Sequence, residues 1–443
     1  MYFFLFYQKK NMEKNSEINL LEAQEKTNYL LNSKKLRKRG KKKFKNLFKK
    51  SGIIIKNTII KPEIKNNKNN NDNNEQIKKK RNPGIDLVRL LTMYLVIVTH
   101  SLQFTNAYRF FYNHERILRI IQSCIDWNNN AFILISGIVG YKTNKYSNLL
   151  YLWLMVVFYS VGIYKYVITY KKEFPLNQYS NFMYNPVVYN LYWYFTTYFV
   201  MYLFLPVING GIAKISKFEL GLVVISTLGI LIFWKDYKRP KEDVFHLSGG
   251  GSALWFLTYY LTGAYIGKYG VNFNGYKKYV YCLICATIFI LASFIYFKLN
   301  IKEYYFFIRN KKIDIPDYFR QIPFASLTSI LKIAQSISIC LFFLQIHYNK
   351  YIAKIICFFG PLAFSVYLIH SNRLSLENYM PRFFINQPRN ISLESLLSFM
   401  FLKSFKIFAF CLFIDYLRHL LFSFLRIKNI LLFIETKMKE KFN

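Results

Sequence analysis

The chain has 443 residues, a formal net charge of +38 at pH 7 and a hydrophobic content of 53%. That length would suit two or three soluble domains, but the apolar residues fall in long blocks, which excludes an ordinary soluble protein. Most of the positive charge outside the first 82 residues is scattered through the loops between these blocks and not gathered on one soluble face, so we expect no nucleic-acid partner.

The first 82 residues are predicted to form a basic, low-complexity and disordered tail. Residues 65–75 consist almost entirely of Lys and Asn and contain no apolar side chain with which to build a core. Residues 33–50 combine many Lys and Arg with a few apolar residues. This segment fits a basic helix lying on an anionic membrane, a nuclear-type signal, or a solvated tail.

About ten apolar segments follow the tail, and each approaches the roughly 20 residues that a helix needs to cross a bilayer. The chain is therefore predicted to be an all-α, polytopic integral membrane protein. The predicted spans are 87–105, 127–142, 148–168, 187–206, 217–234, 252–269, 278–297, 325–347, 353–371 and 400–425.

The charges that flank these segments predict the orientation of the chain. Residues 78–81 are three Lys and one Arg directly before the first span, so the N-terminus is expected in the cytoplasm. An even number of spans would return the C-terminus to the same side. Residues 428–443 are also basic and are predicted to be cytoplasmic.

The first span contains three ionisable side chains, which are costly in a bilayer and therefore point to a function. Arg89 and His100 are eleven residues apart, which places them on one helix face about 16 Å apart along the axis. Asp86 stands one turn before Arg89 and is expected to pair with it. The other interpretation is that Asp86 and Arg89 anchor the helix at the interface and His100 bonds a neighbouring helix.

The spacing of Arg89 and His100 after Ile85 and Asp86 resembles the opening motif of the acyltransferase 3 family, a group of membrane-embedded O-acyltransferases. Later segments resemble further motifs of that family in the same order. They are Phe132–Gly137, Trp193–Pro206, Leu254–Phe256 with Gly263 and Gly267, and Phe364–His370. The chain departs from many relatives at 197–199, where Thr-Tyr-Phe stands in place of a stretch with two acidic residues.

The resemblance implies that residues 83–427 form a transmembrane domain that transfers an acyl group, usually acetyl from acetyl-CoA, to a carbohydrate or glycolipid hydroxyl. Acyl-CoA would be a co-substrate, and no bound cofactor is expected. His100 is predicted to take the proton of the acceptor hydroxyl as general base. Arg89, oriented by Asp86, is predicted to bind phosphates of the donor.

Four further residues are predicted to contact substrate: Asn130, Ser136, Trp193 and His370. Asn130, Ser136 and His370 each have a structural alternative. The first lies in an Asn triplet that could simply hydrate a helix end, and Ser136 with its following Gly would permit close helix packing. His370 ends an apolar span and could face either the same cavity or the interface.

The rival function is a transporter or flippase, in which intramembrane Arg, His and Asp line a substrate path. No metal site is expected, because the histidines form no HxxxH or His-x-Cys pattern. Cys282 and Cys285 form a CxxC inside an apolar run and are interpreted as buried thiols. Asp415 in the last span is predicted to pair with Arg418 or His419 one turn away.

Overall fold

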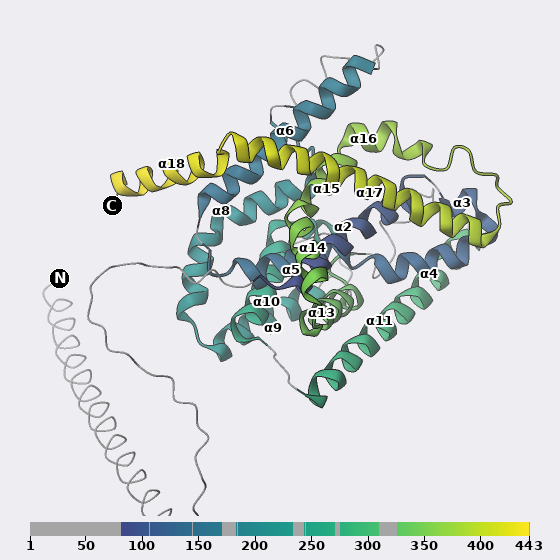
Figure 1. The fold of residues 1–443 in the computed structure, drawn as a ribbon. Helices are drawn as coiled ribbons and strands as arrows, with labels where there is room; N and C mark the ends of the chain where they lie inside the picture. The colour runs from purple at the N-terminus through teal and green to yellow at the C-terminus, as the bar shows by residue number, and fades with distance from the viewer. Residues whose placement is uncertain are drawn as a thin grey trace, which may run out of the picture. The chain divides into compact units, whose positions relative to one another are not determined.

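The computed structural model describes residues 81–442 except 106, 144, 171–182, 184, 234–242, 244, 271–274 and 310–325, so the predicted tail lies outside the described residues apart from Arg81 and Asn82. Every regular element in the described part of the chain is helical (Figure 1). The longer helices are α2 (Pro83–Gln103), α4 (Glu115–Ile125), α5 (Asn128–Gly140), α6 (Tyr146–Tyr170), α8 (Trp193–Lys214), α9 (Lys217–Ile232), α10 (Ala253–Tyr269), α11 (Tyr276–Arg309), α13 (Ile330–Gln345), α14 (Lys350–Phe359), α15 (Ala363–His370), α17 (Leu393–Phe424) and α18 (Ile427–Phe442). The short ones are α3 (Ala107–Phe110), α16 (Arg373–Asn378) and the 3₁₀ turns η1 (Tyr112–His114), η3 (Ser248–Gly250), η4 (Gly360–Leu362) and η5 (Met380–Arg382).

Six helical segments of the described residues are long and apolar enough to cross a membrane. They are Pro83–Gln103, Tyr146–Thr169, Trp193–Lys214, Tyr276–Lys302, Lys350–His370 and Leu393–Phe424. The other four predicted spans also contain helices, but α5, α9, α10 and α13 have 13, 16, 17 and 16 residues. The helical class is confirmed, whereas the count of about ten spans stays a prediction.

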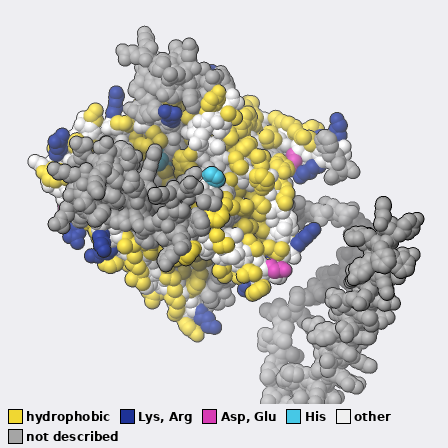
Figure 2. Space-filling view, turned by 180° about the vertical axis from the view of Figure 1, so that it is seen from behind, with side chains coloured by type: hydrophobic (Ala, Val, Ile, Leu, Met, Phe, Trp, Pro, Cys, Tyr) yellow, Lys and Arg dark blue, Asp and Glu magenta, His cyan; other side chains and the backbone are white. Residues whose placement is uncertain are grey.

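Apolar side chains cover much of the surface that these helices present (Figure 2). Large exposed examples are Phe204, Val207, Phe218, Ile225, Leu283 and Phe410. A soluble monomer rarely exposes apolar patches of this extent, so this surface fits contact with lipid.

Helix α2 lies at the centre of the helical domain. It packs against α4, α5, α13, α14, α15 and α17 (Figure 1). Over its most apolar 18 residues 56% are buried, compared with 28–44% for the other five candidate spans. Residues on α2 are therefore held by neighbours on several sides.

The start of α2 is fixed by local sequence. The Asn82 side chain accepts a hydrogen bond of 2.8 Å from the backbone N–H of Gly84, and Pro83 occupies the first helical position, where its missing N–H costs nothing. Asp86 adds a negative charge in the first turn, where the helix dipole favours it. These features set the register that carries Arg89 and His100.

Helices α5 and α10 approach each other closely through glycine. A Cβ at Gly137 would lie 2.1 Å from the carbonyl oxygen of Tyr260, and a Cβ at Gly263 would lie 2.1 Å from that of Leu134. No larger residue fits at this contact, as is typical of small-residue packing between membrane helices.

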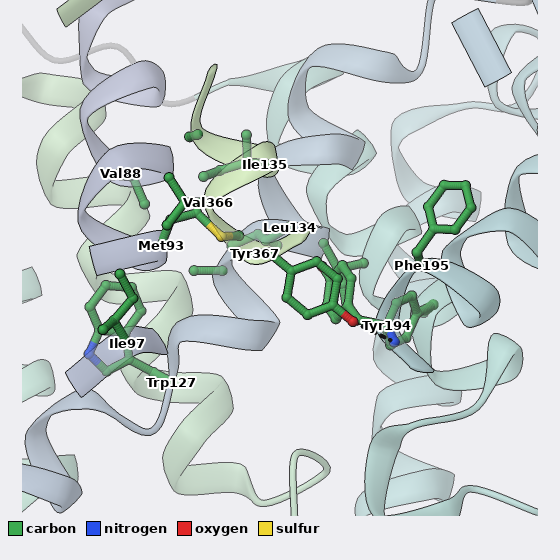
Figure 3. Close-up of a cluster of buried hydrophobic side chains, with 14 of the residues drawn as sticks. Val88, Met93, Ile97, Trp127, Leu134, Ile135, Tyr194, Phe195, Val366 and Tyr367 are labelled. Carbon is green, nitrogen blue, oxygen red and sulfur yellow. Dashed lines mark hydrogen bonds between the residues drawn. The ribbon is translucent and has the colours of Figure 1, made fainter. Parts of the chain in front are cut away.

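Apolar side chains from α2, α5, α8 and α15 meet in the core (Figure 3). Met93 and Ile97 of α2 contribute from the stretch between Arg89 and His100, and Leu134 and Tyr367 face them from α5 and α15. This packing holds the central part of α2 and leaves its two polar ends to form separate sites.

Candidate active site

A cavity of about 640 Å³ lies at the N-terminal end of α2, and we call it the cationic cavity. Its polar and charged lining residues are Arg81, Asn82, Asp86, Arg89, Tyr141, Lys142, Thr143 and Gln345. Its apolar walls come from α5, α10 and α13, including Ile138, Val139, Ile266 and Leu344. Three cationic side chains and one carboxylate leave the lining with a positive balance.

Asp86 organises the two arginines of this cavity. Its carboxylate accepts hydrogen bonds of 2.8 Å from Nη1 of Arg89 and from Nη2 of Arg81, together with one from Nε of Arg81. The side chain is fully buried and lies against Gly360, where a Cβ would come within 2.5 Å of the Asp86 carboxyl carbon. The predicted pairing of Asp86 with Arg89 is confirmed, and Arg81 is an addition that the sequence interpretation missed.

A second cavity, of about 390 Å³, lies at the C-terminal end of α2, and we call it the histidine cavity. Its lining residues are Val96, Thr99, His100, Gln103, Phe104, Gln122, Asp126, Asn128, Asn129, Trp193, Gly249, Gly251, Leu327 and Lys332. Amides, an imidazole, an ion pair and two aromatic rings therefore surround one space. The predicted residues His100 and Trp193 both line it.

His100 lies among three side chains that bear on its orientation. Its ring centroid is 5.1 Å from that of His370 and 5.1 Å from that of Phe104. Its Nδ1 is 3.4 Å from Oγ of Ser371, and that hydroxyl is 2.9 Å from Nε2 of His370. The structure thus brings His370 beside His100. The Ser371 hydroxyl lies between nitrogens of the two rings, and the sequence interpretation did not consider this serine.

A buried ion pair forms another wall of the histidine cavity. Nζ of Lys332 lies 3.3 Å from Oδ2 of Asp126, and the Tyr296 hydroxyl donates a hydrogen bond of 2.8 Å to the same oxygen. Both charged side chains are less than a tenth exposed. The sequence interpretation missed the pair, although Lys332 stands inside the predicted 325–347 span, where a charged residue is itself a signal of function.

Asn130 and Ser136 line neither cavity. The Asn130 amide donates a hydrogen bond of 2.7 Å to the Leu327 carbonyl and accepts one of 3.2 Å from the Trp255 indole, so it joins α5 to its neighbours. Ser136 donates a hydrogen bond of 3.0 Å to the Phe132 carbonyl of its own helix. The substrate contacts of Asn130 and Ser136 stay predictions.

Asp415, the acidic residue in the last span, has a partner inside the protein. Asp415 is fully buried and forms an ion pair with Arg418 at 2.6 Å. Tyr159 donates a hydrogen bond of 2.6 Å to Asp415, and Arg418 donates one of 2.9 Å to the Tyr151 hydroxyl. The predicted pairing with Arg418 is confirmed, and this cluster ties α17 to α6 outside both cavities.

The six cysteines are free thiols. Within the described ranges, no group of three or more His, Cys, Asp and Glu is arranged to hold a metal ion.

The apolar helices and the polar cavities between them define a multi-pass membrane protein with polar cavities inside the helical domain. The particular family follows from a comparison: a family model described as an acyltransferase domain, that of the acyltransferase 3 family, matches residues 82–425. The chain belongs to this family, and the match favours acyl transfer over the transporter interpretation. No curated protein and no solved structure matches the chain.

Proposed function

We propose that this acyltransferase moves a short acyl group, such as acetyl, from acyl-CoA to a hydroxyl of a carbohydrate or glycolipid. The observation that carries the proposal is the pair of cavities at opposite ends of α2, one cationic at Arg89 and one containing the imidazole of His100. A donor rich in phosphate and an acceptor rich in hydroxyl groups need two sites of these different kinds.

The donor would bind at the cationic cavity. Coenzyme A carries phosphate groups, and the planar guanidinium groups of Arg81 and Arg89 suit paired hydrogen bonds to phosphate oxygens. Asp86 would hold the guanidinium of Arg89 in place, and Lys142 would add a third positive charge to the same lining. The apolar wall from α5 and α10 suits the uncharged parts of the donor.

The thioester would then have to reach His100 along α2. Eleven residues at about 1.5 Å each separate the two side chains by about 16 Å, a distance that the extended pantetheine arm of CoA can span. Met93 and Val96 lie on α2 between the two ends. The flexible, unbranched side chain of Met93 is suited to yield to such an arm.

The acceptor would bind in the histidine cavity. Asn128, Asn129 and Gln122 supply hydrogen-bond donors and acceptors for hydroxyl groups, and the exposed indole of Trp193 offers an apolar face for a sugar ring. A volume of about 390 Å³ lies within the range of small-molecule sites.

His100 would act as general base in a single acyl transfer. As the acceptor oxygen attacks the thioester carbonyl carbon, its proton moves to a ring nitrogen of His100. The new C–O bond forms, the C–S bond breaks, and the departing sulfur takes the proton from His100. The products are an ester and free CoA thiol, and His100 returns to its neutral form.

The direct test is label transfer by the purified protein in lipid nanodiscs. Radiolabelled acetyl-CoA would be supplied with a panel of glycans and glycolipids, and free thiol would be measured in parallel. We expect an acyl ester on an acceptor and a loss of about 10²- to 10⁴-fold in rate for His100→Ala. Equal labelling by both proteins would refute the role of His100. Movement of a substrate into proteoliposomes without any acyl donor would instead support transport.

A further inference from the structure

A chain of hydrogen bonds runs from His100 to a backbone carbonyl one turn before the end of α15. Nδ1 of His100 lies 3.4 Å from Oγ of Ser371, and that oxygen lies 2.9 Å from Nε2 of His370. Nδ1 of His370 then lies 2.5 Å from the carbonyl oxygen of Val366. His370 and Ser371 are both buried, whereas His100 lines the histidine cavity.

The carbonyl of Val366 determines where the protons of this chain reside. A carbonyl oxygen only accepts hydrogen bonds, so Nδ1 of His370 must carry a proton. Nε2 of a neutral His370 is then an acceptor and takes the single hydroxyl proton of Ser371. The Ser371 oxygen is left to accept, so the hydrogen bond to His100 requires a proton on its Nδ1.

The opposite arrangement would require a buried charge. If Ser371 donated its proton to His100, Nε2 of His370 would have to carry a proton as well, which would make His370 an imidazolium ion. The described residues place no carboxylate in contact with His370, which is 4% exposed. An unpaired charge in such a position is strongly disfavoured.

We propose that Ser371 and His370 are positioning residues that hold His100 as its Nδ1–H tautomer and so leave Nε2 as the basic nitrogen. This inference rests on the proposed function, because it assigns the nitrogen that takes the acceptor proton. The transferred proton stays on Nε2 of His100 until the departing sulfur takes it. The protons of Ser371 and His370 keep their places throughout.

The same chain stabilises His100 while it is charged. Its Nδ1–H donates to Ser371, which donates to His370, which donates to the Val366 carbonyl near the C-terminus of α15. His100 itself lies in the last turn of α2. The C-terminal ends of helices carry partial negative charge, so both helix ends favour the transient imidazolium.

The kinetic test removes the serine hydroxyl and then restores it. Ser371→Ala is expected to lower kcat by on the order of 10- to 100-fold with little change in the KM of either substrate, while Ser371→Thr recovers most of the rate. Ser365→Ala is the matched control, because Ser365 is also a buried serine and its hydroxyl donates to the Leu362 carbonyl. In a His100→Ala background Ser371→Ala should cause no further loss, since both changes disable one unit.

A second measurement reads the tautomer without any turnover. Nitrogen-15 NMR of histidine-labelled protein in lipid distinguishes a protonated from an unprotonated ring nitrogen, and a His100→Gln variant identifies the signals of His100. We expect protonated Nδ1 and unprotonated Nε2 in wild type and a mixture of tautomers in Ser371→Ala.

The outcomes separate the inference from the function on which it rests. Absence of any acyl transfer by wild type would refute the proposed function, and the tautomer spectrum would still test the hydrogen-bond chain. An active wild type whose Ser371→Ala variant behaves like Ser365→Ala would refute the positioning role. A proton on Nε2 of His100 in neutral wild type would refute it as well.

Discussion

The two ends of α2 differ in the way their charges are arranged. At the cationic cavity one buried carboxylate, Asp86, serves two guanidinium groups, and Lys142 adds further positive charge. At the histidine cavity one carboxylate, Asp126, matches one ammonium group, that of Lys332. The first end retains positive charge for an anionic ligand, while the second end is electrically balanced and rich in hydrogen-bonding groups.

Under the proposed function, this difference assigns one substrate to each end of a single helix. The eleven-residue spacing keeps Arg89 and His100 on one face, and the caps and neighbours of α2 fix both ends at once. The cationic end fits a phosphate-bearing donor, and the balanced end fits an uncharged polyhydroxyl acceptor. Under this assignment, a substitution at one end should change the kinetics of one substrate only.

The largest effect on one substrate alone is expected for Arg89→Ala. Loss of a guanidinium that binds phosphate should raise the KM for acyl-CoA and lower kcat/KM for the donor by about 100-fold, while the KM for the acceptor stays constant. Arg89→Lys keeps the charge but loses the planar fork, so it should recover only part of the loss. Initial rates with each substrate varied in turn provide the measurement. An acceptor KM that rises in parallel would contradict the division between the two ends.

Helix α5 lines both cavities, so a substitution that displaces it should affect both substrates. Helix α5 contributes Asn128 and Asn129 to the histidine cavity and Ile138 to the cationic cavity, and it packs on α10 at Gly263. Gly263→Ala should destabilise the protein by about 1–3 kcal/mol, because the new methyl group has no room.

Gly263→Ala should also change the KM values of both the donor and the acceptor. Gly162 is the matched control: it lies within α6 with no atom near its Cβ direction. Gly162→Ala should stabilise the helix by about 0.4–1 kcal/mol through lower backbone entropy in the unfolded chain. Thermal unfolding in detergent and substrate kinetics would be measured for both variants. A Gly263→Ala variant as stable as wild type would show that α5 and α10 can separate freely.

A smaller and more selective effect is expected for Asp126→Asn. The change keeps the shape of the side chain but removes its charge, leaves Lys332 without its counter-ion, and should raise the acceptor KM by about 10-fold with the donor KM constant. Asp415→Asn removes another buried carboxylate paired with a cation, in a cluster outside both cavities. As the control, Asp415→Asn should lower the free energy of unfolding and leave the KM values of both substrates unchanged. Equal effects of the two substitutions on the KM values would show that Asp126 is not part of the acceptor site.

Hydropathy predicted the helices well because burial in lipid or in the core requires apolar residues in either case. The same pattern could not separate long spans from shorter helices such as α5, with 13 residues, since helix ends depend on local caps and neighbours. Spacing also predicted that Arg89 and His100 share one face, and the two residues line cavities at opposite ends of α2.

Contacts between distant segments could not be predicted in this way. Ser371 meets His100 across 271 positions, and no local motif marks a serine after a span as part of a site. Lys332 and Asp126 come from separate helical regions, so only the charge of Lys332 within a span hinted at their role. Asn130 shows the reverse case, in which a polar residue beside the site has its hydrogen bonds satisfied by Trp255 of α10 and by the Leu327 carbonyl before α13.

The smallest effect concerns Glu435 of α18, which holds the start of α6 just beyond the cationic cavity. Its carboxylate accepts hydrogen bonds from the backbone N–H groups of Tyr146 and Ser147, at 3.2 and 2.9 Å, and from Lys439 at 2.8 Å. Burial raises the pKa of Glu435, but these hydrogen bonds outweigh it and lower the pKa from 4.5 to about 2.

Because the folded-state pKa lies below the unfolded value, the stabilisation by Glu435 is complete above about pH 4.5 and is lost as the pH falls toward 2. Glu435→Gln should therefore lower the free energy of unfolding at pH 7 by less than about 1 kcal/mol and lower the unfolding temperature slightly. The difference in unfolding temperature between the two proteins should disappear in acid. Thermal unfolding of both proteins between pH 7 and 3 provides the measurement. The KM values of both substrates should not change, since Glu435 lines neither cavity. If the difference in unfolding temperature stays constant with pH, the substitution acts through packing and not through charge. If the KM of the donor alone changes, α18 contributes to the cationic cavity.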